Sequence, residues 1–247
     1  MTKGAEHPLN GMLQGDLPSF LGYPAKMEPN DTYAHQITQA INGDETAFAQ
    51  LFEVYRERLR KMVDLRLNSK LQGRCDASDV LQDAFIEAAR QLPKFVANSE
   101  LPFFLWLRLI AAQRLSKLHR EHLGTEKRDL NREVSLAAAC GPEASVFNLA
   151  GCFADTMTSP SAHLLRDELR ARIQSVLDRM EPHDREVLAL RHFEELTIHE
   201  SAQVLGISET AASSRYRRAI VRIRSAFEQV PGLLDNLSDS SGVSDNG

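Results

Sequence analysis

The richest set of side chains able to do chemistry lies between residues 208 and 227, where five arginines are opposed only by Glu209. A guanidinium group binds phosphate oxygens and can also pair with guanine through two parallel hydrogen bonds. On a helix the arginines fall on the two flanks of one apolar stripe, with Arg215, Arg218 and Arg222 on one side and Arg217 and Arg224 on the other. The pattern suits a helix that binds nucleic acid, but for this helix taken alone the alternative of an ordinary solvated helix is favoured.

The residues before this helix indicate how it is positioned. A short apolar period over residues 198–205 predicts a first helix, Gly206 suits the left-handed residue of a tight turn, and Ser208 suits the cap of the second helix. These signals together predict a helix-turn-helix, whose second helix enters the DNA major groove. The candidate DNA-binding residues are Ser208, Glu209, Thr210, Ser214, Arg215, Arg217, Arg218 and Arg222.

A second candidate site lies in an apolar and cationic segment that begins at residue 103. Trp106, Gln113, Lys117 and Arg120 are spaced by seven, four and three residues, which places them along one stripe of a helix. An aromatic ring stacks on unpaired bases and the cations neutralise phosphates, so the stripe suits a single strand of nucleic acid. The alternative is that Trp106 is a large core residue, and the pattern alone favours this alternative.

A third candidate surface is acidic. Asp79, Gln82, Asp83 and Ile86 share one face of a predicted helix, so an isoleucine lies among carboxylates and an amide. An acidic face repels DNA but suits docking to a protein. From the spacing alone, protein docking and ordinary solvation are both open.

The elements that position these sites are all helical, because no stretch shows the alternating apolar pattern of a strand. We expect an all-α fold of two small helical domains joined by a flexible linker, with the helix-turn-helix in the second. Asp44 and Asp76 are expected to cap two helices of the first domain, and Arg56, Arg58, Arg60 and Lys61 to form a solvated surface. The expected order is a disordered leader (1–33), the first domain (34–123), the linker (124–163), the second domain (164–228) and a disordered acidic tail (229–247).

The charge is unevenly distributed along the 247 residues. The net charge of −5 arises from the leader, the linker and the tail, whereas residues 36–123 and 166–227 carry +2 and +1. Nearly neutral domains predict weak DNA binding by the chain alone, supplemented by a partner. The three cysteines form no disulfide or zinc pattern, and His119 and His122 lack further ligands, so we expect no metal and no cofactor. Without a signal peptide or a membrane span, we expect a cytoplasmic protein.

Two segments of the first domain resemble bacterial sigma factors of the extracytoplasmic-function (ECF) group. The run from Asp79 through Gln82 to Phe85 resembles the family's D-x-x-Q-x-x-F segment, and the run from Trp106 to Gln113 resembles its W-L-x-x-I-A-x-N segment. The resemblance implies that Asp79, Gln82, Asp83 and Ile86 dock on the clamp of the largest subunit of RNA polymerase. It also implies that the Trp106 stripe melts and reads the minus-ten promoter element, with Gln113 where the family usually has Asn.

The second domain resembles the region of these sigma factors that binds the minus-thirty-five element. The resemblance lies in residues 184–191, in Leu205-Gly-Ile-Ser208-Glu and in Ser214-Arg215 with Arg218-Ala219. The two resembling blocks cover roughly residues 37–123 and 164–227. Ala211-Ala212 stands where family members commonly carry Thr-Val, so this helix is expected to position the chain by phosphate contacts more than by reading bases.

The sequence therefore predicts a factor that binds core RNA polymerase and directs promoter-specific initiation by recognising and melting promoter DNA. The resemblance also implies an anti-sigma factor as an optional partner. The alternative is a stand-alone helix-turn-helix repressor with an N-terminal helical sensor domain, which leaves the acidic face unexplained. An enzyme is not expected, because no nucleophile–base pair, phosphate-binding glycine loop or ligand cluster is present.

Overall fold

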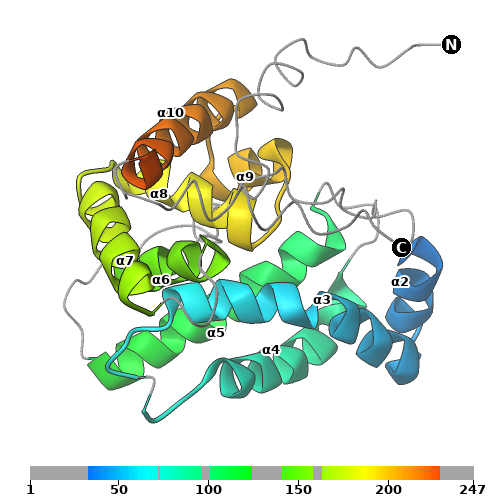
Figure 1. Cartoon of the computed structure of the whole chain (residues 1–247). Coiled ribbons are helices and arrows are strands. Elements are labelled where there is room, and N and C mark those ends of the chain that lie inside the picture. Colours follow the sequence, from blue (N-terminus) through cyan, green and yellow to red (C-terminus); the bar gives the residue numbers. More distant parts are fainter. Residues whose placement is uncertain (1–32, 72, 96–100, 124–140, 158–162, 229–247) are drawn as a thin grey trace, which may run out of the picture.

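The computed structural model describes residues 33–71, 73–95, 101–123, 141–157 and 163–228, and within these ranges the regular structure is helical with no strand. The prediction of an all-α fold is confirmed (Figure 1). In chain order the elements are α2 (Ala34–Ile41), α3 (Glu45–Arg66), α4 (Ala77–Gln91), the 3₁₀ turn η3 (Leu92–Lys94), α5 (Phe103–Leu123), α6 (Val146–Met157), α7 (His163–Asp178), α8 (Pro182–Leu188), the π-helix η5 (Ala189–Phe193), α9 (Ile198–Leu205) and α10 (Glu209–Glu228).

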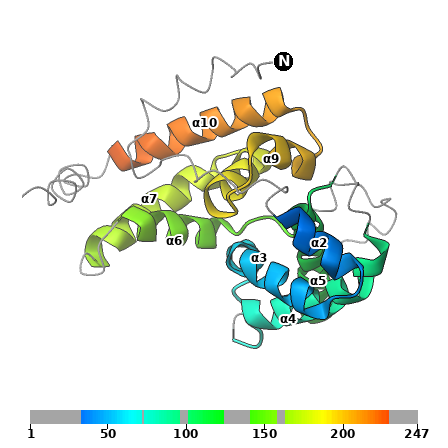
Figure 2. The same ribbon diagram turned by 90° about the vertical axis from the view of Figure 1, so that its right-hand side faces the viewer.

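The first block consists of α2 to α5, and its core is aromatic. Both predicted caps are present: Asp44 accepts two backbone N–H bonds at the start of α3, and Asp76 forms a capping box with Asp79 at the start of α4. The ring centroid of Phe85 lies 5.1 Å from that of Phe48 and 5.1 Å from that of Phe52. These contacts pack α4 against α3, and Figure 2 shows the block as a layer separate from α10.

The second block consists of α7 to α10. Thr197 and Glu200 form a capping box at the start of α9, which satisfies backbone N–H groups that the helix itself leaves unpaired. Gly206 ends α9 with a φ of 64°, the left-handed conformation that favours glycine. The predicted helix-turn-helix is confirmed, and the first helix has the predicted bounds.

The predicted linker is wrong in part, because residues 146–157 form α6. Buried Leu149 and Phe153 pack this helix into the core, and α6 contacts α7 extensively. Asn148 Nδ2 donates to the carbonyl oxygens of Asp64 at 2.8 Å and Leu67 at 3.2 Å, so α6 also covers the C-terminal end of α3. The periodicity missed α6 because glycine and proline flank and interrupt it. The predicted leader up to residue 32, the tail from residue 229 and the linker residues 124–140 and 158–162 lie outside the described residues.

The two blocks meet at a buried ion cluster formed by Arg66, Arg108, Glu186 and Glu194. Arg66 pairs with Glu186 and, at 2.5 Å, with Glu194, while Arg108 Nε donates to Glu194 at 2.6 Å. Burial raises the pKa of the Glu194 carboxyl, but Arg108 and Arg66 outweigh this effect and hold that pKa below its usual value. The cluster therefore joins α3 and α5 of the first block to the second block with paired charges.

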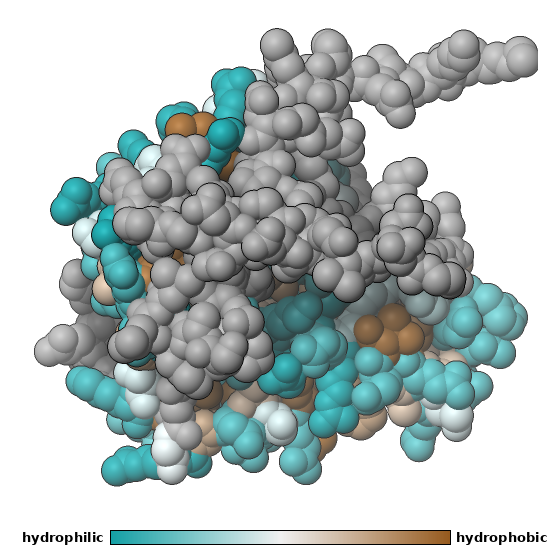
Figure 3. Space-filling model, viewed as in Figure 1, coloured by the Kyte–Doolittle hydropathy of each residue, from teal (hydrophilic) through white to brown (hydrophobic). Residues whose placement is uncertain are grey.

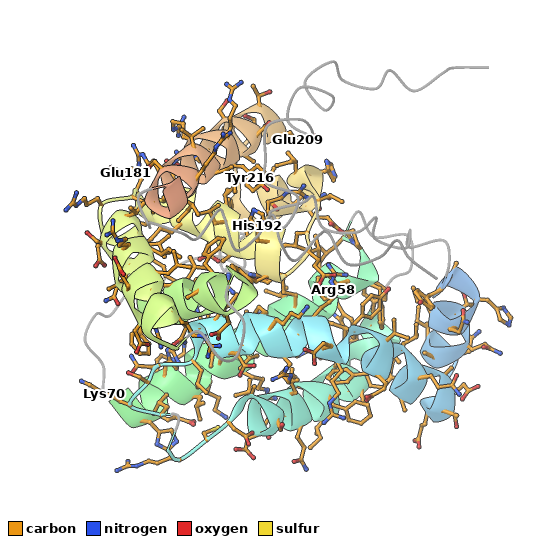
Figure 4. All side chains as sticks on the ribbon, in the orientation of Figure 1. Arg58, Lys70, Glu181, His192, Glu209 and Tyr216 are labelled. Carbon is orange, nitrogen blue, oxygen red and sulfur yellow. The ribbon has the colours of Figure 1, made fainter. Side chains whose placement is uncertain are left out.

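One of the predicted surface cations belongs to the same contact. Arg58 does not lie on a solvated surface, because its guanidinium stacks 3.7 Å from the centroid of the Phe104 ring. It also donates to the carbonyl oxygens of Glu194 at 3.0 Å and Glu195 at 3.3 Å. Figure 4 shows Arg58 directed from α3 toward the second block. The prediction of a solvated surface was wrong for Arg58, because helical spacing shows which residues face away from the core of their own domain. It does not show that a second domain packs on them.

Candidate nucleic-acid and protein interfaces

The helix-turn-helix presents a cationic outer surface on a packed base. The base consists of Ala212, Tyr216, Ala219, Ile220 and Ile223, all buried as predicted. Ser208 Oγ accepts the backbone N–H of Ala211 at 3.2 Å, and His199 Nδ1 lies 2.6 Å from Glu209 Oε1, which links α9 to the first turn of α10. Among the candidate residues, Ser208, Glu209, Thr210, Arg217, Arg218 and Arg222 are exposed, whereas Ser214 and Arg215 are half-buried.

Two of these arginines share a buried partner that the sequence did not reveal. Asp184, in the first turn of α8, accepts a hydrogen bond from Arg215 Nη1 and another from Arg218 Nη2, both at 3.2 Å and both on Oδ1. The Asp184 side chain is 2% exposed, whereas the side chains of Arg215 and Arg218 are 31% and 53% exposed. Asp184 lies 31 residues from Arg215 and 34 residues from Arg218 in the chain, so no local spacing in the sequence indicates these two contacts.

The buried face of α10 packs against a histidine of η5, His192. His192 Nε2 lies 2.9 Å from the hydroxyl of Tyr216, and Figure 4 shows the two residues together beneath α10. The His192 ring also packs edge-on against Phe153 at 5.9 Å between centroids. Burial and, to a smaller extent, the charge of the nearby Arg191 together lower the pKa of His192 to about 4. The interface helix therefore packs on an uncharged imidazole at neutral pH.

The stripe on α5 is divided in the structure. Gln113, Lys117 and Arg120 are exposed, so they share a solvent-facing surface as predicted. Trp106 is only 8% exposed, and its ring lies 4.8 Å from that of Phe95 and 5.4 Å from that of Phe103. The structure thus does not bring Trp106 onto the cationic surface, and its position matches the alternative of a core residue.

The acidic face of α4 is intact on the surface. Asp79, Gln82, Asp83 and Ile86 are all exposed, and Ile86 is 60% exposed, which is unusual for a large aliphatic side chain. Hydrophilic residues predominate on the part of the described surface visible in Figure 3, with hydrophobic ones scattered between them. An exposed isoleucine framed by two carboxylates and an amide can bury apolar area against a partner that carries matching cations.

A charged cluster beside this face has a structural role. Glu87 accepts hydrogen bonds from Arg90 and Gln91 and pairs with Arg114 of α5. These partners lower the pKa of Glu87 to about 2. The cluster fixes α4 against α5 and so holds the acidic face in place.

The described residues contain neither a cluster of metal ligands nor a helix that could span a membrane. No group of three or more histidine, cysteine or acidic side chains converges there as ligands for a metal ion. None of the described helices is long and apolar enough to span a bilayer.

Comparison with known proteins agrees with this geometry. Residues 176–225 match the family described as Sigma-70, region 4. The RNA polymerase sigma factor CnrH of Cupriavidus metallidurans is 27% identical over 204 residues, which cover 82% of this chain and 97% of the relative. The ECF RNA polymerase sigma factor SigW of Bacillus subtilis is 24% identical over 189 residues, which cover 76% and 93%. Over most of its length the chain is therefore similar to proteins named as RNA polymerase sigma factors, some of them of the ECF group.

The match to region 4 takes in α8, α9 and most of α10, the helices that carry Asp184 and the five arginines. The match to CnrH is long enough to include parts of both blocks. A solved structure of CnrH in complex with the cytosolic domain of CnrY aligns with a TM-score of 0.49 and 23% identity, covering 80% of this chain and 98% of that chain.

Proposed function

We propose that this chain is an ECF sigma factor, which binds core RNA polymerase and directs initiation at specific promoters by recognising and melting their DNA. The observation that carries the proposal is a helix-turn-helix with exposed arginines, in a chain whose relatives are named as sigma factors and match it over nearly their whole length. The site of action is the cytoplasm, where bacterial polymerase works.

The second block is assigned to duplex DNA upstream of the start site. The outer face of α10 enters the major groove, and Arg217, Arg218 and Arg222 supply exposed cations for phosphates or guanine. Ser208, Glu209 and Thr210 lie at the exposed start of the helix, where recognition helices usually meet base edges. Ser214 and Arg215 are half-buried, and they contribute contacts to the DNA from the side of the helix that lies nearer the core.

The first block is assigned to polymerase and to the opened strand. The acidic face of α4 docks on the polymerase, because its exposed isoleucine and carboxylates suit an apolar and basic partner surface. Gln113, Lys117 and Arg120 contact the backbone of the opened strand. Trp106 must leave its contacts with Phe95 and Phe103 before a base can stack on it. The family resemblance adds an anti-sigma factor as a further partner.

Transcription reconstituted from the full chain, bacterial core polymerase and genomic DNA tests the proposal. We expect start sites that depend on adding the chain and that share sequence elements upstream. Absence of initiation from any template contradicts the proposal. A strong specific footprint by the chain without polymerase would instead support the alternative, a stand-alone repressor.

A further inference from the structure

We propose that Asp184 is a positioning residue for DNA recognition, which holds Arg215 and Arg218 in one geometry and thereby raises specific binding relative to non-specific binding. The inference rests on the proposed function, in particular on α10 entering the groove. Asp184 lies on α8, outside the helix-turn-helix itself, and would touch no DNA.

The geometry is that of a buried anion beneath two cations. Arg215 and Arg218 are one turn apart on α10, and both donate to Asp184 Oδ1 at 3.2 Å. The Asp184 side chain is 2% exposed, while the side chains of Arg215 and Arg218 are 31% and 53% exposed. A guanidinium has five N–H donors, so the bond to Asp184 leaves donors on each arginine for phosphate or guanine.

The shared carboxylate should act on the two kinds of binding in opposite directions. It reduces the joint charge of the two arginines from +2 to +1, which weakens the phosphate attraction that dominates non-specific binding. It also orders two long side chains before DNA arrives, so that specific binding no longer has to order them. The result is a larger ratio of specific to non-specific affinity.

A purely structural ion pair would behave differently. Its removal would destabilise α10 and weaken binding to every duplex alike. Opposite changes in specific and non-specific affinity therefore distinguish positioning from simple support.

The test compares Asp184→Leu, which removes the charge and the acceptor while keeping the number and branching of side-chain heavy atoms, with Asp184→Asn, which retains Oδ1. The matched control is Asp178→Asn, which removes one exposed carboxylate from the last residue of α7 in the same block. The probes are a 30-base-pair duplex enriched from a random pool by wild-type holoenzyme and a scrambled duplex of the same composition, with Kd measured for each holoenzyme over a salt series. Thermal melting followed by circular dichroism sets a temperature at which each variant is folded.

For Asp184→Leu we expect binding to the enriched duplex to weaken by about 5- to 150-fold, because two side chains must then be ordered on binding. Binding to the scrambled duplex should tighten, with a salt slope steeper by about one. Asp184→Asn should lie between wild type and Asp184→Leu, and Asp178→Asn should leave the ratio of the two affinities unchanged. If Asp184→Leu does not fold, a lowered ratio in Asp184→Asn supports the inference and an unchanged ratio overturns it.

Equal losses on both duplexes, or a ratio like that of Asp178→Asn, would overturn the inference and leave the proposed function intact. A wild-type holoenzyme that enriches no sequence from the pool would overturn the proposed function and this inference with it.

Discussion

Acidification from pH 7 to pH 5 should destabilise the second block through His192. Its pKa falls from 6.5 to about 4 in the folded protein. The unfolded state therefore binds more protons than the folded state between these values, and stability is lost as the pH falls through this window. At pH 5 the unfolded imidazole is nearly fully protonated while the folded one is mostly neutral, which amounts to about 2 kcal/mol of unfolding free energy. Urea unfolding followed by circular dichroism at the two pH values measures the loss.

The control for this prediction is His192→Phe, which keeps a ring against Phe153 and Tyr216 but cannot titrate. It should be less stable at pH 7 by about 1 kcal/mol, because the hydrogen bond between His192 and the Tyr216 hydroxyl is lost. Its stability should fall by about 2 kcal/mol less than that of wild type between pH 7 and pH 5. Carboxylates such as Glu194 titrate in both proteins and cancel in the comparison. Parallel pH curves for the two proteins, or an NMR titration of folded His192 near 6.5, would refute the reasoning.

Three further predictions concern docking, the contact between the blocks and the turn. Ile86→Glu should weaken binding to core polymerase by about tenfold or more, because apolar contact is lost. The control Val54→Glu changes another exposed aliphatic side chain and should not weaken binding. Equal effects of the two substitutions in a pull-down titration would refute docking through α4. Glu194→Gln should cost about 3–5 kcal/mol, because Arg66 and Arg108 lose their shared buried anion; a urea midpoint unchanged from wild type would contradict this. Gly206→Ala should cost about 1–2 kcal/mol, because alanine adopts the positive φ poorly, and a melting temperature at or above that of wild type would show the turn to be relaxed.

Local signals predicted the helices well, because caps and apolar periods act within one turn of chain. Asp44, Asp76, Gly206 and Ser208 all take the predicted roles at helix ends. The exposed acidic face of α4 and the packed stripe of α10 followed from period alone. Residues whose partners lie far along the chain were predicted wrongly or not at all, because spacing carries no information about which elements meet.

Three residues illustrate that limit. Arg58 has the spacing of a solvated cation and instead stacks on Phe104 under the second block. Asp184 resembles an ordinary first-turn acid, but the fold places it beneath two arginines of α10. Trp106 has the spacing of a stripe shared with Lys117, yet Phe95 packs over its ring. In each case tertiary packing determines the environment that gives the side chain its chemistry.

The buried ion cluster between the blocks has a consequence for how the protein can change shape. Pulling Arg66 and Arg108 away from Glu186 and Glu194 returns four charged groups to water, which hydrates them strongly. Separation of a hydrophobic interface of equal area would expose apolar surface that is prone to aggregation, whereas separation of this interface exposes charged surface that water hydrates. Such a contact selects one relative orientation of the two blocks but adds little net free energy to their association. The two blocks are therefore oriented by the cluster and can still separate.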